Sequence, residues 1–325
     1  MVLEHPFCKR KSLINPLKLD IQTYIFTARS DLSFLKYTLP ALVKISEKGE
    51  SRVSVILDTG NPTGVLGDSL VQRNLNEAIQ EIEKIQNSNT FNFLKTKYDS
   101  PTIKETNRIQ LGFPYKETHC FRGYPIHGSF KQFSDTDSKY ILHLDCDMIF
   151  YEAPKYSWIQ EGMRIMEENE DILCVLPRGG PPTKDGSLHQ GTTQYQVDEK
   201  RGLYLFKNFT SRHYLVHRER FLSLMPMKPL WLSWREPIKS RLFGNGKMLC
   251  WESMVEHAMR NSSFWRADLM TSKAWSIHPG DRSEKFKKLI PQVINRVNLG
   301  EYPDEQAGHF DLFLDCWENF IDDKS

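Results

Sequence analysis

The chain has 325 residues, of which 43 are Lys or Arg and 41 are Asp or Glu, and its net charge is +2. This balance argues against non-specific binding to nucleic acid, and a content of 39% hydrophobic and 12% aromatic residues excludes a disordered chain. No uncharged apolar run approaches the roughly 18 residues of a membrane-spanning helix, and residues 1–20 have no apolar signal core. We therefore expect a soluble, cytoplasmic protein without a membrane span.

The cysteines are scattered along the chain with no short spacing between them. They are Cys8, Cys120, Cys146, Cys174, Cys250 and Cys316. Neither a zinc site nor a secreted disulfide framework has this pattern. The spacing therefore predicts free thiols.

The first half of the chain predicts strands that alternate with helices. Residues 21–27 are rich in β-branched and aromatic side chains and precede an apolar helical pattern, which Pro40 kinks or interrupts. The nearly all-apolar run 52–57 predicts a buried parallel strand that ends at Asp58. Residues 87–120 are polar and give no clear pattern beyond a short strand. The other elements predicted here are a helix at 68–86, the short strand at 91–94, a helix at 125–133 and a strand at 139–144.

The second half continues the alternation around one long loop. Residues 177–186 contain the densest cluster of turn-forming residues and are a candidate substrate loop. The predicted elements are helices at 154–168 and 247–260 and strands at 171–176, 202–206, 214–217 and 264–269. This alternation predicts an α/β fold with a mostly parallel central sheet flanked by helices.

Two carboxylates follow the apolar strand at 139–144. Asp145 and Asp147 lie at its carboxyl end, which faces the ligand crevice in open α/β sheets. On extended backbone they point to the same side, where they suit Mg²⁺ or Mn²⁺ with substrate phosphate oxygens as further ligands. The alternative is a pair of surface aspartates in a turn. The apolar residues 148–150 favour the metal site, because they bury its surroundings.

The chain resembles the nucleotide-sugar glycosyltransferases of the GT-A fold, particularly the large family 2. The resemblance is a spaced series of weak motifs within residues 21–31, 52–58, 122–150, 212–221 and 250–278. It implies one GT-A domain with a Rossmann-like sheet. The implied organisation is an extension at 1–20, a domain at 21–300 with a nucleotide-binding half at 21–150 and an acceptor-binding half at 151–300, and a tail at 301–325 that packs on the domain.

The resemblance implies a nucleotide-sugar site beside the first strands. The turn formed by Thr27, Ala28 and Arg29 corresponds to the family segment that holds base and ribose, and Asp58 corresponds to an acidic residue that contacts one of them. Arg122 begins a segment similar to the family's Arg-Asn-x-Gly pattern, with the Asn replaced. The alternatives are a helix cap for Thr27, an Asx turn for Asp58 and a solvated side chain for Arg122.

The same resemblance assigns the D-x-D motif and a late histidine. Asp145 corresponds to the carboxylate near ribose and metal, with Cys146 beside the nucleotide sugar, and Asp147 to the direct metal ligand. His278 corresponds to the histidine that completes the metal or diphosphate site, and the Pro-Gly after it fixes a turn that would present its ring. A structural or surface role for His278 is the alternative.

The helix at 247–260 carries the candidate catalytic base. Glu252 lies at the edge of an apolar stripe, where partial burial would raise the pKa of its carboxyl toward the range of a general base. The segment around Glu252 is similar to the family's Glu-Asp acceptor motif, with the second carboxylate replaced by Ser253. A salt-bridged helix residue is the alternative. Trp251 and Arg178 are the expected acceptor contacts, and Trp231 and Trp234 either stack on sugars or pack in the core.

Together the motifs predict a metal-dependent glycosyltransferase of the hexosyltransferase type, using Mn²⁺ or Mg²⁺. A sugar would pass from a nucleoside-diphosphate sugar to the hydroxyl of a small-molecule or glycan acceptor, with inversion. The alternatives are a retaining GT-A enzyme, a D-x-D phosphohydrolase, a nucleotidyltransferase and a non-catalytic carbohydrate- or nucleotide-binding protein. A nucleotidyltransferase would need a glycine-rich loop after the first strand, and residues 27–31 contain no Gly.

Overall fold

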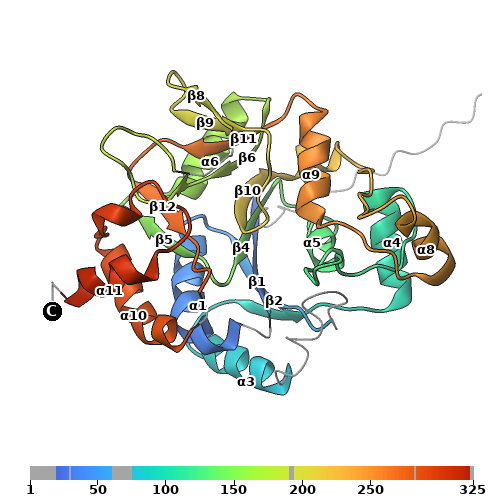
Figure 1. The fold of residues 1–325 in the computed structure, drawn as a ribbon, viewed down its shortest axis with the longest axis horizontal. Coiled ribbons are helices and arrows are strands. Elements are labelled where there is room, and N and C mark those ends of the chain that lie inside the picture. Colours follow the sequence, from blue (N-terminus) through green and yellow to red (C-terminus); the bar gives the residue numbers. More distant parts are fainter. Residues whose placement is uncertain (1–19, 29–30, 61–74, 190–193, 282, 323–325) are drawn as a thin grey trace, which may run out of the picture.

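The computed structural model describes residues 20–28, 31–60, 75–189, 194–281 and 283–322 (Figure 1). Arg29, almost all of the predicted extension at 1–20 and the first part of the predicted helix at 68–86 lie outside the described residues. Within the described ranges, no helix combines the length and the apolar character needed to cross a lipid bilayer.

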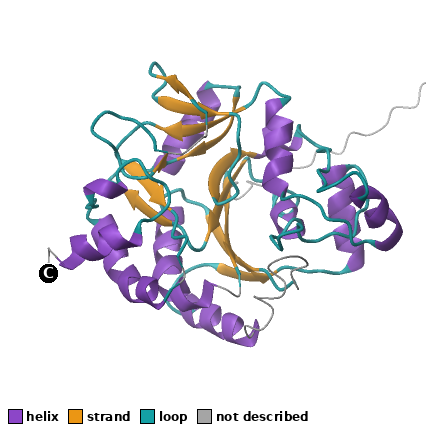
Figure 2. Cartoon of the chain, in the orientation of Figure 1, coloured by secondary structure: helices purple, strands orange, loops and turns teal. Residues whose placement is uncertain are grey.

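A nine-stranded sheet runs through the centre of the protein (Figure 2). Its strands, in spatial order, are β3 (Asn92–Lys95), β2 (Arg52–Leu57), β1 (Ile21–Thr27), β4 (Tyr140–Asp145), β10 (His213–His217), β6 (Ile172–Leu176), β11 (Trp265–Leu269), β9 (Leu203–Phe206) and β8 (Gln196–Asp198). Only β10 and β9 run against the common direction of these strands. The α/β class with a mostly parallel sheet is therefore confirmed.

Strand β4 lies in the middle of this sheet between a parallel and an antiparallel neighbour. Its backbone pairs with β1, where Phe26 stands opposite Asp145, and with β10, where His213 stands opposite Leu144. Five of its six residues are buried, and only the terminal Asp145 is partly exposed. A strand covered on both faces needs mostly apolar side chains, which explains the run before the two aspartates, where His143 is the polar exception.

Helices cover both faces of the sheet because successive strand residues point to opposite sides. Ile25 faces a core built with α1 (Leu32–Glu47), α3 (Leu75–Gln86) and α6 (Trp158–Glu168). Its neighbours Tyr24 and Phe26 face a second core. That core is built with α4 (Ser100–Leu111), α5 (His127–Lys131), α7 (Arg218–Leu222) and α9 (Trp251–Arg260), and Figure 1 shows α4, α5 and α9 together on one side of the central strands.

A second sheet packs beside the first and is covered by the last helices. It consists of β5 (Ile149–Glu152), β12 (Ala274–Ile277) and β7 (Arg178–Gly179). Helix α10 (Glu284–Asn298), a short 3₁₀ turn η2 (Asp304–Gln306) and α11 (Leu314–Asp322) close a third core over this sheet. Trp317 is completely buried there, and its indole N–H donates to Gln306 Oε1 at 3.0 Å.

Several elements differ from the sequence predictions. Helix α1 runs through Pro40 without interruption, and the predicted helix at 247–260 begins only at Trp251. Helix α4 lies inside 87–120, where no helix was predicted, because its buried residues include Thr106, Asn107 and Gln110 instead of an apolar stripe. Helix α8 (Glu236–Phe243) and the short strands β5, β7, β8 and β12 were also missed.

The third core generates a stability prediction for Trp317→Ala. Because this side chain is fully buried and hydrogen-bonded, its truncation should lower the free energy of unfolding by about 3–5 kcal/mol, measured by urea denaturation. Trp234→Ala is the matched control, since Trp234 is 74% exposed, and should change that free energy by less than about 0.5 kcal/mol. Equal effects of the two substitutions would contradict the packing described here.

Candidate active site

The two aspartates of the D-x-D motif leave β4 in a tight turn. The Met148 N–H donates to the Asp145 carbonyl at 3.1 Å, so the backbone bends between the aspartates. The extended backbone predicted between the two aspartates is therefore replaced by a turn. Asp145 Oδ1 contacts His143 Nε2 at 3.1 Å, and Asp147 is directed to other partners.

Asp147 is brought together with His278, as the resemblance implied. Asp147 Oδ2 lies 3.5 Å from His278 Nε2 and 3.7 Å from Arg212 Nη1, and both Asp147 and His278 are buried. His278 follows β12, and its Nδ1 lies 3.2 Å from Asp311 Oδ1. Backbone bonds from His278 N to Phe310 O and from Leu312 N to His278 O hold the imidazole against this late segment.

Glu252 lies in the first turn of α9, with its carboxylate held by residues next to β10. Ser211 Oγ donates to Glu252 Oε2 at 2.7 Å, and the Ser211 N–H donates to the same oxygen at 3.3 Å. Burial raises the pKa of the Glu252 carboxyl above its ordinary value, and the two Ser211 hydrogen bonds only partly oppose this. The carboxylate therefore has the environment of a general base.

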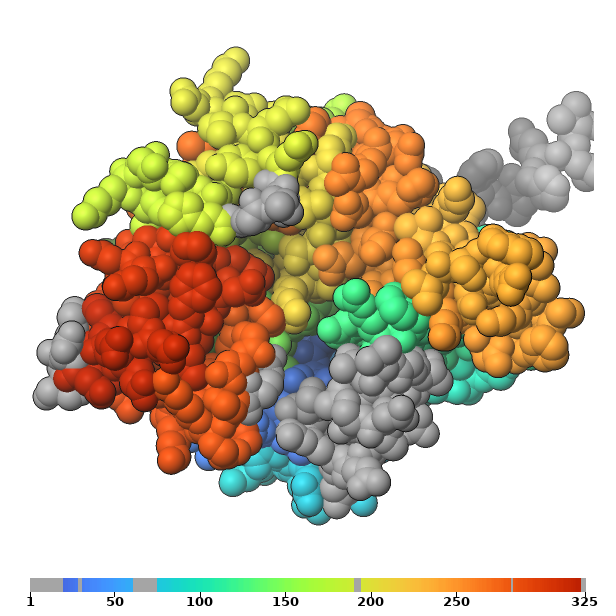
Figure 3. Space-filling view, viewed as in Figure 1, coloured from blue at the N-terminus to red at the C-terminus, as the bar shows by residue number. Residues whose placement is uncertain are grey.

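A cavity of about 370 Å³ connects Glu252 with the neighbourhood of His278. In Figure 3 the surface is hollowed where the red segment after α10 faces the orange α9 and the yellow residues between them. The lining residues are Leu176, Pro177, Gly179, His189, Asn208, Phe209, Thr210, His213, Glu252, Arg266, Asp268, His309, Phe310, Asp311 and Phe313. Asp311 thus lines the cavity and contacts His278.

One wall of this cavity carries a buried ion pair on β11. Arg266 Nε and Nη2 donate to the two oxygens of Asp268 at 2.8 Å each, and neither side chain is more than a few per cent exposed. The pair is bidentate, which is the geometry that stabilises a guanidinium–carboxylate contact away from water. It places fixed polar groups opposite Glu252.

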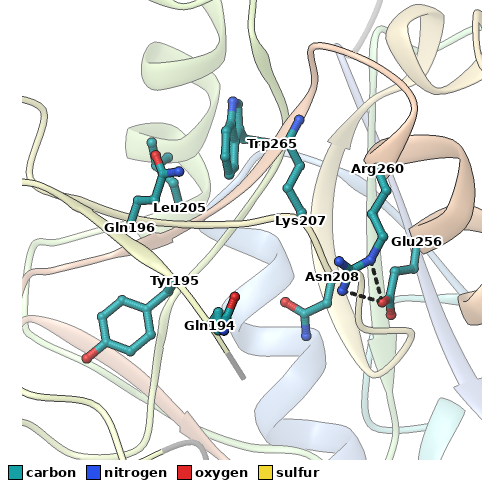
Figure 4. Close-up of a pocket in the computed structure, with 9 residues that line it drawn as sticks. All are labelled: Gln194, Tyr195, Gln196, Leu205, Lys207, Asn208, Glu256, Arg260 and Trp265. Atoms are coloured by element: carbon teal, nitrogen blue, oxygen red, sulfur yellow. Dashed lines mark hydrogen bonds and ion pairs between the residues drawn. The ribbon is translucent and has the colours of Figure 1, made fainter. Parts of the chain in front are cut away.

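A larger cavity of about 830 Å³ adjoins the first, and Asn208 lines both. Figure 4 shows Asn208 beside the ion pair of Glu256 and Arg260, in which Arg260 Nε donates to Glu256 Oε1 at 2.9 Å. Gln194, Gln196, Lys207 and Trp265 form other parts of the lining. Amides, charged groups and aromatic rings together suit a hydroxyl-rich ligand better than an apolar one.

Asp58 ends β2 and is held by a cluster of hydrogen bonds. His119 Nε2 contacts Asp58 Oδ2 at 3.1 Å, Tyr98 Oη donates to Oδ1 at 2.6 Å, and the Gly60 N–H donates to Oδ1 at 2.9 Å. Burial alone would raise the pKa of Asp58, but the hydrogen bonds from His119, Tyr98 and Gly60 lower it below its ordinary value. Asp58 therefore forms the Asx-type contact to the Gly60 N–H and, at the same time, side-chain contacts to Tyr98 and His119.

The turn after β1 is fastened to the D-x-D segment through Asp31. Asp31 Oδ2 accepts from the Ala28 N–H at 2.8 Å and from the Cys146 thiol at 3.1 Å. Thr27 and Cys146 are both buried, so their side chains stabilise the turn from inside. Arg122 is exposed, and its guanidinium lies over the ring of the neighbouring Phe121.

Trp251 and Arg178 do not lie where an acceptor could reach them. The Trp251 indole is 3% exposed and packs against Phe130 and Phe209 in the second core. Arg178 is 1% exposed, and its guanidinium donates to Tyr204 Oη and to loop carbonyls that include Gly186. Both predicted acceptor contacts are corrected by this burial: Trp251 is a core residue, and Arg178 holds the loop after β7.

Sequence reasoning missed Arg212, Asp311 and Ser211. Ser211 and Arg212 immediately precede β10. The family resemblance begins at residue 212 in this part of the chain, so it leaves Ser211 out. Asp311 lies between Phe310 and Leu312, and this alternation of apolar and polar residues indicates an extended segment with one buried side. Gly180 shows how closely this segment is packed, since a Cβ there would meet the His309 carbonyl oxygen at 2.4 Å.

No protein-family model and no curated protein sequence matches the chain. Among solved structures, S. aureus TarS is 11% identical with a TM-score of 0.40, over 78% of this chain and 36% of that chain. UDP-glucose pyrophosphorylase complexed with UDP-glucose is 9% identical with a TM-score of 0.43, over 85% and 97%. The galactosyltransferase LgtC with donor and acceptor sugar analogues is 11% identical with a TM-score of 0.34, over 87% and 98%. This chain thus spans about a third of TarS, and activity has to be argued from the site.

The Asp58 cluster generates a prediction for Tyr98→Phe. Loss of the Tyr98 donor to a partly buried carboxylate should lower the free energy of unfolding at neutral pH by about 1–3 kcal/mol. The pKa of Asp58 is lowered in the folded state, so its stabilisation is present at neutral pH and disappears as the pH falls through that pKa. The difference between variant and wild type, measured by urea denaturation, should therefore shrink in acid.

The matched control for this experiment is Tyr124→Phe, because Tyr124 is 45% exposed. It should leave the free energy of unfolding within about 0.5 kcal/mol of wild type at either pH. A Tyr98→Phe effect that stays constant from neutral to acidic pH would show that the hydroxyl does not act through Asp58.

Proposed function

We propose that this protein is a metal-dependent glycosyltransferase that moves a hexosyl group from a nucleoside-diphosphate sugar to an acceptor hydroxyl, with inversion. One observation carries the proposal. At the carboxyl end of β4, Asp147 Oδ2 lies 3.5 Å from His278 Nε2, and Asp311 connects this pair to a cavity that Glu252 lines. A pair of side chains that can bind a cation, close to a cavity lined by a carboxylate with a raised pKa, is what such a transfer requires.

The donor atoms of Asp147 and His278 suit Mn²⁺ or Mg²⁺, with Asp145 as a further carboxylate. His278 Nε2 is buried and has no hydrogen-bond partner among the described residues, so it is open to coordination. Within those residues no group of three or more His, Cys, Asp or Glu side chains is arranged to hold a metal ion. An ion held by Asp147 and His278 would therefore have to take most of its ligands from substrate phosphates and water. When bound, such a cation would neutralise negative charge on the departing diphosphate.

On the acceptor side, Glu252 is the proposed base. Its carboxylate would accept the proton of the acceptor hydroxyl as the oxygen attacks the anomeric carbon from the face opposite the diphosphate, which gives inversion. Ser211 holds Oε2 with two hydrogen bonds and so orients the carboxylate. The cavity wall formed by Arg266 and Asp268 would fix acceptor hydroxyls, and the acceptor would extend past Asn208 into the larger cavity.

The nucleotide is proposed to lie across the ends of β1, β2 and β4. Thr27 and Ala28 would contribute mainly backbone groups, because the Thr27 side chain is buried. Asp58 and the exposed Arg122 would contact base or ribose, and Asp145 and Cys146 the ribose side of the donor. Arg29 remains a predicted contact that lies outside the described residues.

The metal assignment predicts that Asp147→Asn lowers turnover of the donor by at least about 100-fold. The measurement is release of nucleoside diphosphate from a panel of nucleotide sugars in the presence of Mn²⁺, with melting temperature as the check on folding. Asp135→Asn, on the surface and paired with Lys131, is the control and should retain wild-type turnover. Full turnover by the Asp147→Asn variant would refute the metal site, and no diphosphate release by wild type would favour a non-catalytic binding protein.

The base assignment predicts a pH dependence governed by Glu252. Activity should fall as the pH drops through the raised pKa of this carboxyl, since only the ionised form accepts a proton. Glu252→Gln should lower kcat by about 10²–10⁴-fold. Ser211→Ala removes a hydrogen bond that stabilises the carboxylate, so the acidic limb of the kcat/KM profile should move to higher pH.

The control for the pH profile is Ser223→Ala, because Ser223 Oγ donates only to the Arg220 carbonyl on α7. It should leave the acidic limb where wild type has it. If the acidic limb does not move in Ser211→Ala, or if Glu252→Gln keeps the kcat of wild type, a group other than Glu252 takes the proton of the acceptor hydroxyl.

A further inference from the structure

Two thiols that are far apart in the sequence meet beside the candidate site. The Cys250 thiol donates to Cys120 Sγ at 3.2 Å, although 130 positions separate the residues. Cys120 is 1% exposed, and Cys250 is half-buried, so small reagents reach the pair from the side of Cys250. The five described cysteines are free thiols, as the sequence predicted, but their spacing along the chain does not indicate this contact.

Backbone hydrogen bonds hold together the two segments that carry these sulfurs. The Cys120 N–H donates to the Tyr124 carbonyl at 2.8 Å, and the Phe121 N–H donates to the Met248 carbonyl at 2.8 Å. Met248 is fully buried in the second core, and Cys250 occupies the N-cap position of α9. The strand-like segment before Cys250 and the turn after Cys120 are therefore already joined, so bringing the sulfurs into bonding distance needs only a small side-chain movement.

The surroundings favour a thiolate at this pair. The hydrogen bond from Cys250 and the N–H groups of Arg122, Gly123 and Tyr124 lower the pKa of Cys120, against the effect of burial. The same contact raises the pKa of Cys250. Once one of the two thiol protons has been lost, the two sulfurs share the remaining proton. The thiolate is the reactive form of cysteine in oxidation.

The other described cysteines have the opposite environment. Burial raises the pKa of Cys146 and of Cys174, and it raises the pKa of Cys316 to about 11. Oxidation should therefore select the pair over these thiols.

We propose that Cys120 and Cys250 form a thiol modification site at which hydrogen peroxide produces a disulfide. The thiolate sulfur attacks one peroxide oxygen, the O–O bond breaks, and hydroxide leaves, which yields a sulfenic acid. The second thiol sulfur attacks the sulfenic sulfur, the S–O bond breaks, and the oxygen departs as water with that thiol's proton. Two electrons pass from the two sulfurs to the peroxide, which becomes two water molecules once the hydroxide takes up a proton.

This disulfide would connect the turn before α5 to the N-terminus of α9, two residues before Glu252. It would restrict the unfolded chain across a long loop and so raise the melting temperature. The proposal does not depend on the proposed transferase activity, because the chemistry involves only the two thiols and the oxidant.

The test treats the full-length protein with hydrogen peroxide, blocks remaining thiols with an alkylating reagent under denaturing conditions and maps peptides by mass spectrometry. The expected product is a peptide pair joined through Cys120 and Cys250, formed before Cys146, Cys174 or Cys316 is modified, together with a higher melting temperature that dithiothreitol reverses. Cys316→Ser is the control and should give the same crosslink at the same rate.

Single variants separate the pair from an ordinary reactive cysteine. In Cys250→Ser the sulfenic acid at Cys120 has no thiol partner, so dimedone should label it. In Cys120→Ser the peroxide reaction at Cys250 should slow by at least about 10-fold, because the stabilised thiolate is lost. The proposal is overturned if Cys146, Cys174 or Cys316 of wild type reacts first, or if Cys120 and Cys250 remain fully alkylatable when these three thiols are oxidised.

Discussion

The candidate site depends on two backbone hydrogen bonds that end β4. The Asp145 N–H donates to the Arg212 carbonyl at 2.7 Å, and the Cys146 N–H donates to the Phe26 carbonyl at 2.8 Å. Neighbouring strands thus hold the D-x-D segment from both sides, and the chain turns away immediately afterwards. This constraint directs the Asp147 carboxylate to the imidazole of His278 on the second sheet. Without the antiparallel β10 beside β4, neither Arg212 nor Ser211 would reach the site.

The carboxylates of the candidate site are stabilised by hydrogen-bonding and charged neighbours. Asp147 is buried, which is costly for a carboxylate, and the guanidinium of Arg212 and the imidazole of His278 offset that cost. Glu252 has only hydroxyl and amide donors, so the pKa of its carboxyl stays raised. The two carboxylates therefore have different surroundings: Asp147 has Arg212 and His278 beside it, whereas Glu252 is held by Ser211.

The sequence predicts most of the sheet but little of the contacts around it. Strands β1 and β2 occur at their predicted bounds, because buried parallel strands are rich in β-branched and other apolar residues and can be recognised locally. Trp251 was wrongly assigned to the acceptor site. It belongs to the apolar stripe of its helix, and such a stripe marks the side that faces the core. The meeting of Cys120 with Cys250 arises from packing between distant segments, for which no local pattern exists.

The packing of Gly180 against His309 has a consequence for the order in which the protein can form. The cavity beside Glu252 takes one wall from residues 309–313, which follow all strands of both sheets along the chain. During synthesis, strands β1, β2, β3 and β4 leave the ribosome long before this wall exists. An earlier folded intermediate would therefore present β12 and the loop after β7 uncovered. The cavity is therefore complete only once residues 309–313 have packed beside Gly180.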